Sequence, residues 1–461
     1  MQGSVLLPGA AGFTLAAPVF NAIYDATVPK ALVRCASASD VALALAFAHD
    51  NNLALTVRSG GHGYTGNSTT TGMVIDVGSM NSIVVDSAGG TATIGAGAKL
   101  VDVYDQLSSQ GVCIPSGSCP TIGIAGITLG GGIGLVDRAY GLTCDNLVSA
   151  QVVLADGSIV TCDAVTHADL FWALRGGGGG NFGIVTSMTF NTFATSDVTS
   201  FAASFAWADA AKVLAAWQAW PRTLPDTVWS GLVIGTSGSS SGTPVIQVSG
   251  LSLGSVAQFT PIWTQFLAAA GATPTSQSAM GQTFRDAMLA SCRGETVSQC
   301  HLASETSDGQ VQRARFVASS DFFDATLPAA GIQAMLGAME SLQAGGSVLI
   351  IMDLMGGAIA RVAADATAFV HRNAVFSAQY YISGGIGVSA AQVTQAQGIV
   401  SGLRTTMAPW SSGEAYQNYL DPGLANWQAA YYGANYARLR QVKTAYDPTQ
   451  VFKPAQGVEP A

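Results

Sequence analysis

The sequence predicts an α+β protein of two domains, the second inserted into the first. Three observations lead to this prediction. The chain has 461 residues, which is too long for one ordinary hydrophobic core. Short apolar strands alternate with helices through residue 195, and longer helices follow. Past residue 412 the sequence returns to short motifs, so residues 1–195 and 413–461 are expected to form one domain around an inserted domain of residues 196–412.

Composition limits the classes of partner. Hydrophobic residues make up 49% of the chain and charged residues 10%, as in a folded protein. A net charge of −9 without a basic run argues against nucleic acid or an anionic membrane surface. No uncharged apolar run reaches the about 18 residues of a membrane span. The N-terminus lacks a basic region before an apolar run, which favours the cytoplasm, while secretion stays open.

Cysteine and histidine spacing indicates no metal site. The chain has seven cysteines and five histidines, with no C-x-x-C pair and no metal-ligand spacing. Cys292 and Cys300 are close enough in sequence to form a disulfide. Whether they do depends on the compartment, which the sequence leaves open.

The elements of the first part follow from periodicity. Residues 31–35, 37–52 and 53–59 predict a strand, a helix capped by Ser or Asp, and a second strand, which together make a β-α-β unit. Further along, the patterns predict strands with turns over 73–86 and 91–100, a helix over 101–111, a hairpin over 148–162 around Asp156-Gly157, a helix over 165–176, and a glycine turn with a strand over 176–190. A last helix is predicted to begin near residue 436.

The middle of the chain predicts helices over 208–220 and 259–271 and strands over 228–235 and 243–251. The segment GTSGSSSGT (235–243) predicts the tip of the hairpin between those two strands. SVLIIMDLMGGAIA (347–360) predicts a buried strand and turn containing Asp353, a carboxylate that needs a partner if it is buried. Tryptophans 207, 217, 220, 229 and 263 fall on apolar patterns, so core packing is favoured over stacking on a sugar.

Three glycine clusters stand out, at 59–66, 123–134 and 176–183. A dinucleotide fingerprint is a weak interpretation of them, because LADGS (154–158) predicts a hairpin turn where that motif needs a strand ending in an acid. Glycine in ordered structure costs about 0.5–1 kcal/mol relative to alanine. The clusters therefore predict backbone packed against one large flat or anionic ligand, whose phosphates backbone amides bind well.

Four motifs in their order along the chain resemble one family. They are RSGGHGYTGNS (58–68), SCPTIGIAGITLGGGIG (118–134), DLFWALRGGGGGNFGIVT (169–186), and YQNYLDP (416–422) with YYGANYARLRQVKTAYDPTQVF (431–452). Together they resemble the vanillyl-alcohol-oxidase flavoproteins, and within these the berberine-bridge-enzyme-like oxidases that carry FAD on two covalent bonds. The resemblance implies a PCMH-type FAD-binding domain with an inserted α/β substrate domain, whose antiparallel sheet is covered by helices.

The resemblance also implies which residues hold the cofactor. His62 matches the histidine that bonds the flavin 8α-methyl group, and Cys119 matches the cysteine that bonds flavin C6. Both types of side chain are suitable nucleophiles for an electron-poor ring. Further FAD contacts are implied for Arg58, Ser59, Gly60, Gly61, Gly63, Thr121, Ile122, Gly123, Gly126, Gly130, Gly132, Gly183, Val185, Asn418 and Tyr419.

Five residues match positions around the substrate. Tyr416 resembles the base of sugar-oxidising relatives, Asp353 the aspartate beside it, and Gln379 a substrate-contacting glutamine. Tyr64 and Tyr140 resemble residues that line the substrate face of the flavin, although aromatic core packing is the commoner role of tyrosine. The implied reaction passes the hydroxyl proton to Tyr416 and a hydride to flavin N5, with O2 then reduced to H2O2. Asp353 is expected to take the phenol proton as part of a relay.

Three functions stay open. The favoured one is an oxidase of a sugar or glycosylated compound, which uses a small-molecule substrate and O2. The expected oligomeric state is a monomer or a homodimer. Ile122 matches a position that the family uses near the oxygen-reactive carbon of the flavin, and this resemblance favours an oxidase over a dehydrogenase. The second is a tailoring oxidase or dehydrogenase for an aromatic or alkaloid-like secondary metabolite. The third, a non-catalytic flavin carrier, is disfavoured because His62, Cys119, Tyr416 and Asp353 are all present.

Overall fold

The computed structural model describes residues 1–236, 242–343, 347–383, 386 and 389–461. The first sheet is small and mostly parallel. Its strands are β1 (Ser4–Leu6), β2 (Ala31–Arg34), β3 (Leu55–Arg58) and β4 (Met73–Asp76), in the order β1-β2-β4-β3. The predicted β-α-β unit is confirmed, with β4 lying between its two parallel strands. The helix of this unit begins at its cap Ser37, whose hydroxyl accepts the Asp40 amide at 3.2 Å.

The second sheet is antiparallel and contains the predicted hairpin. Its strands are β5 (Ile83–Asp86), β6 (Thr91–Gly95), β8 (Leu147–Val153), β9 (Ile159–Asp163) and β10 (Ile184–Asn191), in the order β5-β6-β10-β8-β9. The turn between β8 and β9 contains Gly157 with φ +81°, a conformation that suits glycine. A short pair joins β7 (Val112–Cys113) to β11 (Phe193–Ala194).

The third sheet has seven antiparallel strands in the order β15-β12-β14-β13-β17-β18-β16. They are β12 (Val198–Phe205), β13 (Val228–Gly235), β14 (Val245–Leu253), β15 (Pro274–Gln282), β16 (Phe316–Phe323), β17 (Ser347–Leu354) and β18 (Phe376–Ser383). The predicted pairing of β13 with β14 is confirmed. The middle of its predicted Gly/Ser tip, residues 237–241, lies outside the described residues.

Helices cover these sheets and fill the space between them. They are α1 (Phe13–Ala16), α2 (Ala38–Asp50), α3 (Leu100–Ser108), α4 (Ile124–Leu129), α5 (Asp137–Tyr140), α6 (Ala168–Ala173), α7 (Ala210–Ala219), α8 (Val256–Ala270), α9 (Phe284–Met288), α10 (Ala329–Ser341), α11 (Ala390–Met407), α12 (Trp427–Tyr432) and α13 (Tyr436–Tyr446). Short 3-10 turns lie at Ala22–Tyr24, Thr143–Asn146, Trp207–Asp209, Trp220–Arg222, Ala290–Cys292, Ile359–Arg361 and Gly433–Asn435. None of the helices in the described ranges is long and apolar enough to cross a bilayer.

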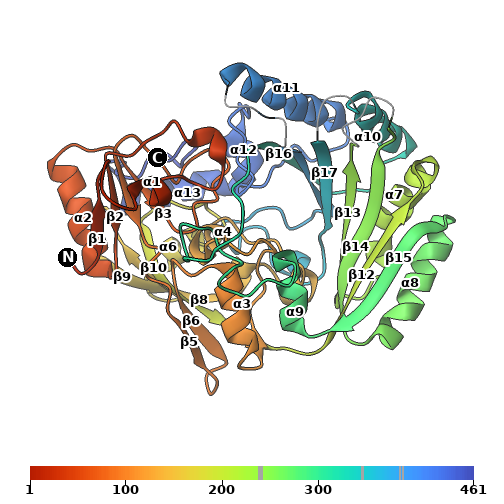
Figure 1. Ribbon diagram of the computed structural model, residues 1–461, viewed down its shortest axis with the longest axis horizontal. Coiled ribbons are helices and arrows are strands. Elements are labelled where there is room, and N and C mark those ends of the chain that lie inside the picture. The colour runs from red at the N-terminus through yellow and green to blue at the C-terminus, as the bar shows by residue number, and fades with distance from the viewer. Residues whose placement is uncertain (237–241, 344–346, 384–385, 387–388) are drawn as a thin grey trace.

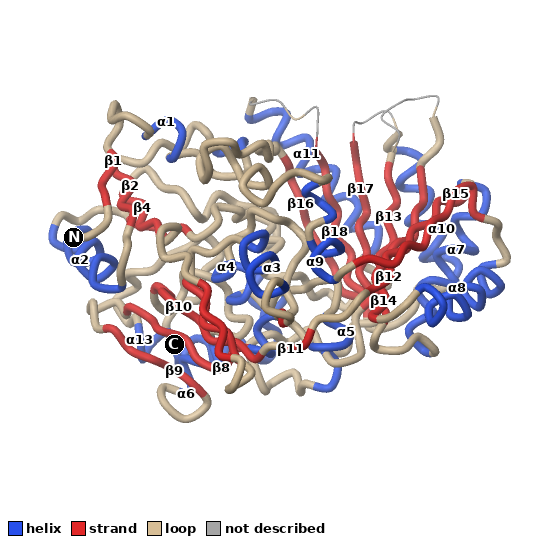
Figure 2. The backbone as a smooth tube through the Cα atoms, turned by 60° about the horizontal axis from the view of Figure 1, so that its bottom comes forward, coloured by secondary structure: helices blue, strands red, loops and turns tan. Residues whose placement is uncertain are grey.

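The seven-stranded sheet has one apolar face and one mixed face, because side chains alternate along each strand. On the apolar face, Leu232, Ile350 and Tyr380 pack with residues of α7, α8, α10 and α11 into one core cluster that includes Trp217, Trp220 and Trp263. Figures 1 and 2 show α7, α8 and α10 on the side of this sheet that is remote from β1–β10. The other face, which carries Asp353 and Gln379, looks toward the first two sheets.

The C-terminal segment packs against the first part of the chain. In Figure 1, α12 and α13 (blue) lie among the red and yellow elements of the N-terminal part. The buried ammonium group of Lys443 on α13 donates to the Asn181 carbonyl oxygen at 2.6 Å and pairs with Asp447 at 2.7 Å. A second core cluster accordingly combines residues of the first two sheets with Tyr431, Leu439 and Phe452. The predicted α+β fold with a helix-covered antiparallel sheet is confirmed, while the boundaries at 195 and 412 stay predictions.

Candidate active site

Two glycine loops meet at the base of the site. A β-carbon on Gly60 would lie 2.1 Å from the Gly123 nitrogen, and one on Gly123 would lie 2.1 Å from the Ser59 hydroxyl oxygen. Only glycine fits at either position, because contacts below 3.0 Å require the backbone to move. This contact brings the His62 loop, which follows β3, against the Cys119 loop, which precedes α4.

Most of the glycines have a different explanation from the one that the sequence suggested. A side chain would collide with Asn418 at Gly130, with Thr143 at Gly132 and with Val152 at Gly183. Packing of protein against protein accounts for these positions and for Gly60 and Gly123.

Three of the predicted glycine contacts have more room. Gly61 has a φ of +71°, and an added β-carbon there would meet its nearest atom at 3.8 Å. At Gly63 the nearest atom would be the Ser68 hydroxyl oxygen, at 3.3 Å. Gly126 is exposed, and an added β-carbon there would have nothing within 4 Å. Gly126 is therefore the position that leaves the backbone most open to a ligand.

Arg58 supports the His62 loop. Its buried guanidinium donates to the carbonyl oxygens of Ala16 and Ala17, each at 2.8 Å, and to that of Ser68 at 3.0 Å. The charged group predicted to touch FAD is therefore directed at three backbone carbonyls. Val185 likewise lies buried in the core of the first part.

His62 is held as a neutral imidazole. Its ring stacks on Phe20 with centroids 4.0 Å apart, and Nε2 lies 2.7 Å from the Thr121 hydroxyl oxygen. Burial, and then the nearby charge of Lys99, lower the pKa of His62 to about 3. A neutral ring keeps the nitrogen lone pair that nucleophilic attack requires. Thr121, predicted as a cofactor contact, orients the ring.

Cys119 differs from the other free cysteines. Its side chain is exposed, whereas Cys35, Cys113, Cys144 and Cys162 are buried. It nevertheless lies deep among protein atoms, which raises the pKa of its thiol. A side chain that is open to solvent and yet surrounded by many protein atoms lies on the wall of a recess, and we place Cys119 there. Half-buried Ile122, three residues further along, donates its amide to the Cys119 carbonyl oxygen at 3.4 Å.

A group of tyrosines lines the same recess. Tyr64 stacks on Tyr419 with centroids 5.2 Å apart, and its hydroxyl oxygen accepts from the Gln379 amide at 2.7 Å. Burial, with Cys119 nearby, raises the pKa values of Tyr64 and Tyr381. The structure thus brings Tyr64, Gln379 and Tyr419 together from three distant segments. The sequence missed Tyr381, although its spacing of two from Gln379 on β18 could have revealed it.

The Tyr416 hydroxyl group is surrounded by donors. It accepts from the Gly132 amide at 2.9 Å, the Ile133 amide at 3.3 Å and the Asn418 side-chain amide at 2.9 Å. We call these three donors the Tyr416 cradle. Burial raises the pKa of Tyr416 to about 12, while the three donors lower it. The oxygen of a neutral phenol has fewer acceptor positions than a phenolate, so the cradle is matched to the ionised form.

Asp353 does not bond to Tyr416. In the part of the chain that the structure describes, the hydroxyl partners of Tyr416 are the cradle donors alone, so the expected relay has no direct hydrogen bond between the two residues. The register of β17 sets Asp353 between Gly231 and Ser377. Burial raises its pKa to about 6, partly offset by Ser377. Its charge acts instead on Tyr419, whose pKa is raised by burial, Tyr64 and Asp353.

Tyr140 is not brought to this group. It ends α5, and its ring stacks face to face on Phe193 with centroids 3.8 Å apart. The stack belongs to the packing around the second core cluster, where a tyrosine is held between apolar neighbours. The prediction that Tyr140 lines the same recess as Tyr64 is not supported by this arrangement.

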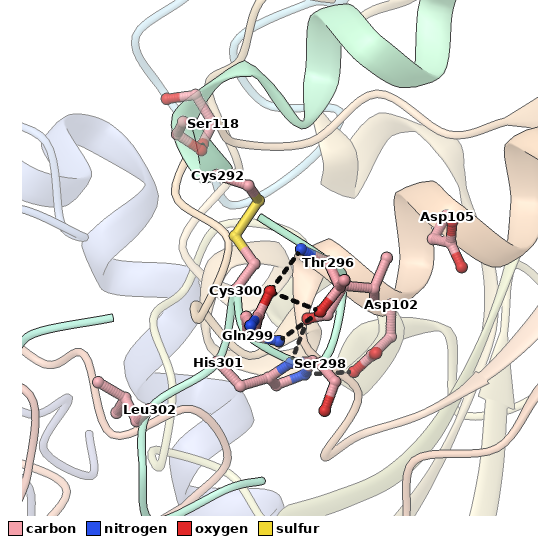
Figure 3. Close-up of a disulfide and its surroundings, with 12 residues drawn as sticks. Asp102, Asp105, Ser118, Cys292, Thr296, Ser298, Gln299, Cys300, His301 and Leu302 are labelled. Atoms are coloured by element: carbon pink, nitrogen blue, oxygen red, sulfur yellow. Dashed lines mark hydrogen bonds and ion pairs between the residues drawn. A yellow bond between two sulfur atoms is a disulfide. The ribbon is translucent and has the colours of Figure 1, made fainter. Parts of the chain in front are cut away.

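The structure contains the disulfide that the sequence could not decide, and this bond supports the recess from outside. Cys292 and Cys300 are bonded and pack on Val101 of α3. Figure 3 shows the bond beside His301, whose Nε2 lies 3.0 Å from Asp102, and Ser291 donates to the carbonyl oxygen of Ser118 at 3.3 Å. Ser118 directly precedes Cys119, so the disulfide loop (residues 289–311) braces the Cys119 segment.

Lys99 ties the same loop to the His62 segment. Its ammonium group lies 2.9 Å from Glu305 of the disulfide loop and donates to the Ser59 carbonyl oxygen at 3.2 Å. This pair is nearly buried, and its position at the end of a glycine-rich turn carried no signal in the sequence. The disulfide loop therefore contacts the Cys119 segment directly and the His62 segment through Lys99.

These residues fit a large flat group. The recess is lined by the exposed Cys119 thiol, the neutral His62 imidazole and the stacked tyrosines Tyr64 and Tyr419. The two nucleophilic side chains, His62 and Cys119, come from two different loops. His62 and Cys119 would hold an isoalloxazine ring, and Gly126 on α4 leaves its backbone uncovered. Within the described ranges no group of three His, Cys, Asp or Glu side chains could hold a metal ion.

Comparison with known proteins defines the class. Residues 29–163 match the family model of a FAD binding domain, and residues 415–459 match the model described as berberine and berberine like. The chain is 33% identical to the uncharacterized FAD-linked oxidoreductase YgaK of Bacillus subtilis, over 94% of this chain and 91% of that one. It is 28% identical to chitooligosaccharide oxidase of Gibberella zeae, over 94% and 87% of the two chains.

Solved structures agree with the family models. Wild-type BBE-like 1 of Physcomitrella patens superposes with a TM-score of 0.90 at 29% identity, covering 99% of this chain and 97% of that one. The chain belongs to the berberine-bridge-enzyme-like family of FAD-linked oxidoreductases, within the superfamily that has PCMH-type FAD-binding domains.

Removal of the disulfide tests whether its loop stabilises the Cys119 segment. The double change Cys292→Ser with Cys300→Ser should lower the free energy of unfolding by about 2–3 kcal/mol, because the bond closes a short loop. Hydrogen exchange should rise in residues 99–108 and 115–123 as well as in the loop itself. Ser307→Ala, an exposed change in the same loop, is the matched control. Exchange confined to 289–311 would show that the loop does not brace the recess.

Proposed function

We propose that the protein is an oxidase that removes a hydride from an alcohol carbon of a sugar or glycosylated compound, with FAD bonded to His62 and Cys119. The observation that carries this proposal is the Tyr416 cradle. Bound FAD would supply the hydride acceptor and pass two electrons on to O2, so that the alcohol and O2 become the corresponding carbonyl compound and H2O2. Every other step falls to side chains of the chain itself.

Tyr416 is the proposed base. Three donors at 2.9–3.3 Å stabilise negative charge on its oxygen, as donors do for the oxyanions of other enzymes. With a pKa of about 12 the phenol still carries its proton at neutral pH, so it must pass that proton on as it accepts another. Asp353, with a pKa of about 6, is ionised at pH 7 and is the proposed recipient. A substrate hydroxyl or a water would bridge the two residues.

Two observations favour a sugar. Gln379 and Tyr64 form a hydrogen-bonded pair beside the recess, and such polar groups suit hydroxyls of a ring. The match to chitooligosaccharide oxidase over nearly the whole chain points in the same direction. Gln379 and Tyr64 are proposed to contact the substrate.

One observation favours the second candidate, an oxidase of aromatic or alkaloid-like compounds. Asp353 shares its sheet face with the half-buried apolar residues Val233, Leu349 and Ile351. An apolar wall suits an aromatic ring better than an oligosaccharide. Peroxide production with sugars, glycosylated aromatics and aglycones separates the two candidates. Turnover of aglycones alone would overturn the sugar assignment.

The disulfide supports secretion over the cytoplasm as the compartment, because such bonds persist in oxidising surroundings. This proposal opposes the expectation from the N-terminal sequence. Alkylation of the protein from its native compartment, followed by mass measurement, would decide between the two.

Covalent attachment is tested by denaturing the yellow protein. Acid precipitation should leave one FAD on the chain, on peptides that contain both His62 and Cys119. His62→Ala and Cys119→Ala should each leave one bond, and the double variant should release free FAD. The matched control is Cys162→Ala, a buried cysteine of the second sheet, which should retain both bonds. Free FAD from the unmodified protein would exclude the proposed attachment.

Loss of the Tyr416 hydroxyl tests the base. Tyr416→Phe should lower kcat/KM for the best substrate by about 10²- to 10⁴-fold while FAD stays bound, because a general base contributes about that much. Asn418→Ala removes one cradle donor and should cost about 10²- to 10³-fold in kcat. Tyr140→Phe, whose ring stacks on Phe193, is the control. A Tyr416→Phe variant within twofold of the unmodified protein would contradict this role.

A further inference from the structure

The loop that supplies two cradle donors is held at its far end by a carboxyl group. Three successive backbone amides of this loop donate hydrogen bonds to side chains. The amides of Gly132 and Ile133 donate to the Tyr416 hydroxyl oxygen, and the amide of Gly134 donates to Asp137 Oδ2 at 3.1 Å. Gly131 and Gly132 have φ values of +122° and +90°, a region that other residues rarely adopt. The loop conformation therefore depends on contacts at both of its ends.

Asp137 is buried with half of its carboxyl group satisfied. Its side chain is 0% exposed, and Oδ1 has no hydrogen-bond partner among the residues that the structure describes. A buried carboxylate with one amide donor is unfavourable, and the neutral acid is favoured instead. Burial first, and then the nearby charge of Asp353, raise the pKa of Asp137 to about 8.

The neighbouring cation does not neutralise Asp137 by contact. The Arg138 guanidinium donates to the carbonyl oxygens of Val228 at 3.0 Å, of Met355, and of Leu224 at 3.4 Å. Its ion-pair partner is Asp226 at 3.8 Å, and Arg361 also pairs with Asp226. The charged groups around Asp137 are thus Arg138 on its own helix, Asp353 on β17, and the Asp226–Arg361 pair beyond Arg138.

The charge of Asp353 disfavours ionisation of Asp137. Two carboxyl groups close together in buried surroundings do not both ionise readily, so their titrations are coupled. Burial also raises the pKa of Asp353, to about 6. Of the two carboxyl groups, Asp137 is the harder to ionise, because its pKa is raised further than that of Asp353.

We propose that Asp137 is a positioning residue for Tyr416: it anchors the Gly132–Gly134 backbone that forms the cradle, and it stays neutral so that Asp353 alone carries charge beside the recess. This inference deepens the proposed function, because it takes Tyr416 to be the base. It adds a residue that contacts neither substrate nor cofactor. Asp137 acts on the cradle backbone through its bond to the Gly134 amide, and it acts on Asp353 through its charge state.

Two variants separate the anchor from the charge. Asp137→Asn keeps an oxygen for the Gly134 amide and cannot ionise, whereas Asp137→Ala removes both features. Asp226→Asn, the other carboxylate near Arg138, is the matched control. In the holoenzyme, Asp137→Ala should lower kcat about 10- to 100-fold with KM within about twofold, because the cradle is misaligned. Asp137→Asn should recover at least tenfold of that loss.

The pH dependence of thermal unfolding tests the charge state without any substrate. A carboxyl group with a raised pKa makes the folded protein bind more protons than the unfolded chain between about pH 4 and 8, so its contribution to stability falls as pH rises. Asp137→Asn removes this dependence. Its midpoint relative to the unmodified protein should therefore rise steadily from pH 5 to pH 8, whereas the difference for Asp226→Asn should stay constant.

Each outcome decides a different claim. A constant difference for Asp137→Asn from pH 5 to 9 would overturn the neutral carboxyl group. An Asp137→Asn variant as slow as Asp137→Ala, or an Asp137→Ala variant as fast as the unmodified protein, would overturn the anchor. Failure of Tyr416 as the base would appear as an active Tyr416→Phe variant, and it leaves the unfolding result unchanged.

Discussion

The close contact between Gly60 and Gly123 is the constraint on which the site depends. Each position would place a β-carbon 2.1 Å from an atom of the opposite loop, so the two backbones meet with no side chain between them. The contact sets His62 and Cys119 on two facing loops of one recess. Thr121, on the same loop as Cys119, then orients the His62 ring at 2.7 Å. A larger residue at Gly60 or Gly123 would push the two loops apart, and it would separate His62 from both Cys119 and Thr121.

The recess is closed by segments from distant parts of the chain. The mixed face of the seven-stranded sheet contributes Asp353 and Gln379, and the C-terminal segment contributes Tyr416 and Tyr419. Because the buried ammonium group of Lys443 on α13 donates to the Asn181 carbonyl oxygen of the first part, the C-terminal tyrosines are held against the glycine loop at 130–134. Donors preorganised in this way act strongly in buried surroundings, where water does not compete with them.

The motifs along the chain identified most of the residues that meet in the recess. The His62 and Cys119 loops, Tyr64, Gln379, Tyr416 and Asn418 do gather there, and the β-α-β unit and the antiparallel hairpin lie where periodicity predicts them. Arg58, Tyr140 and Val185 instead support the surrounding structure. A motif does not reveal which neighbour a side chain meets.

The sequence by itself determined the fold class, the family and the residue types that face the cofactor site, because local periodicity and glycine-flanked motifs depend on neighbours along the chain. Only the tertiary structure decided that the Tyr416 hydroxyl meets the Gly132, Ile133 and Asn418 donors, that Cys292 bonds Cys300, and that Asp137 is a buried acid behind the Tyr416 cradle. The physical reason is that hydrogen bonds and desolvation act through space. The amides of Gly132 and Ile133 meet a tyrosine 283–284 residues away, and no pattern along the chain records that distance.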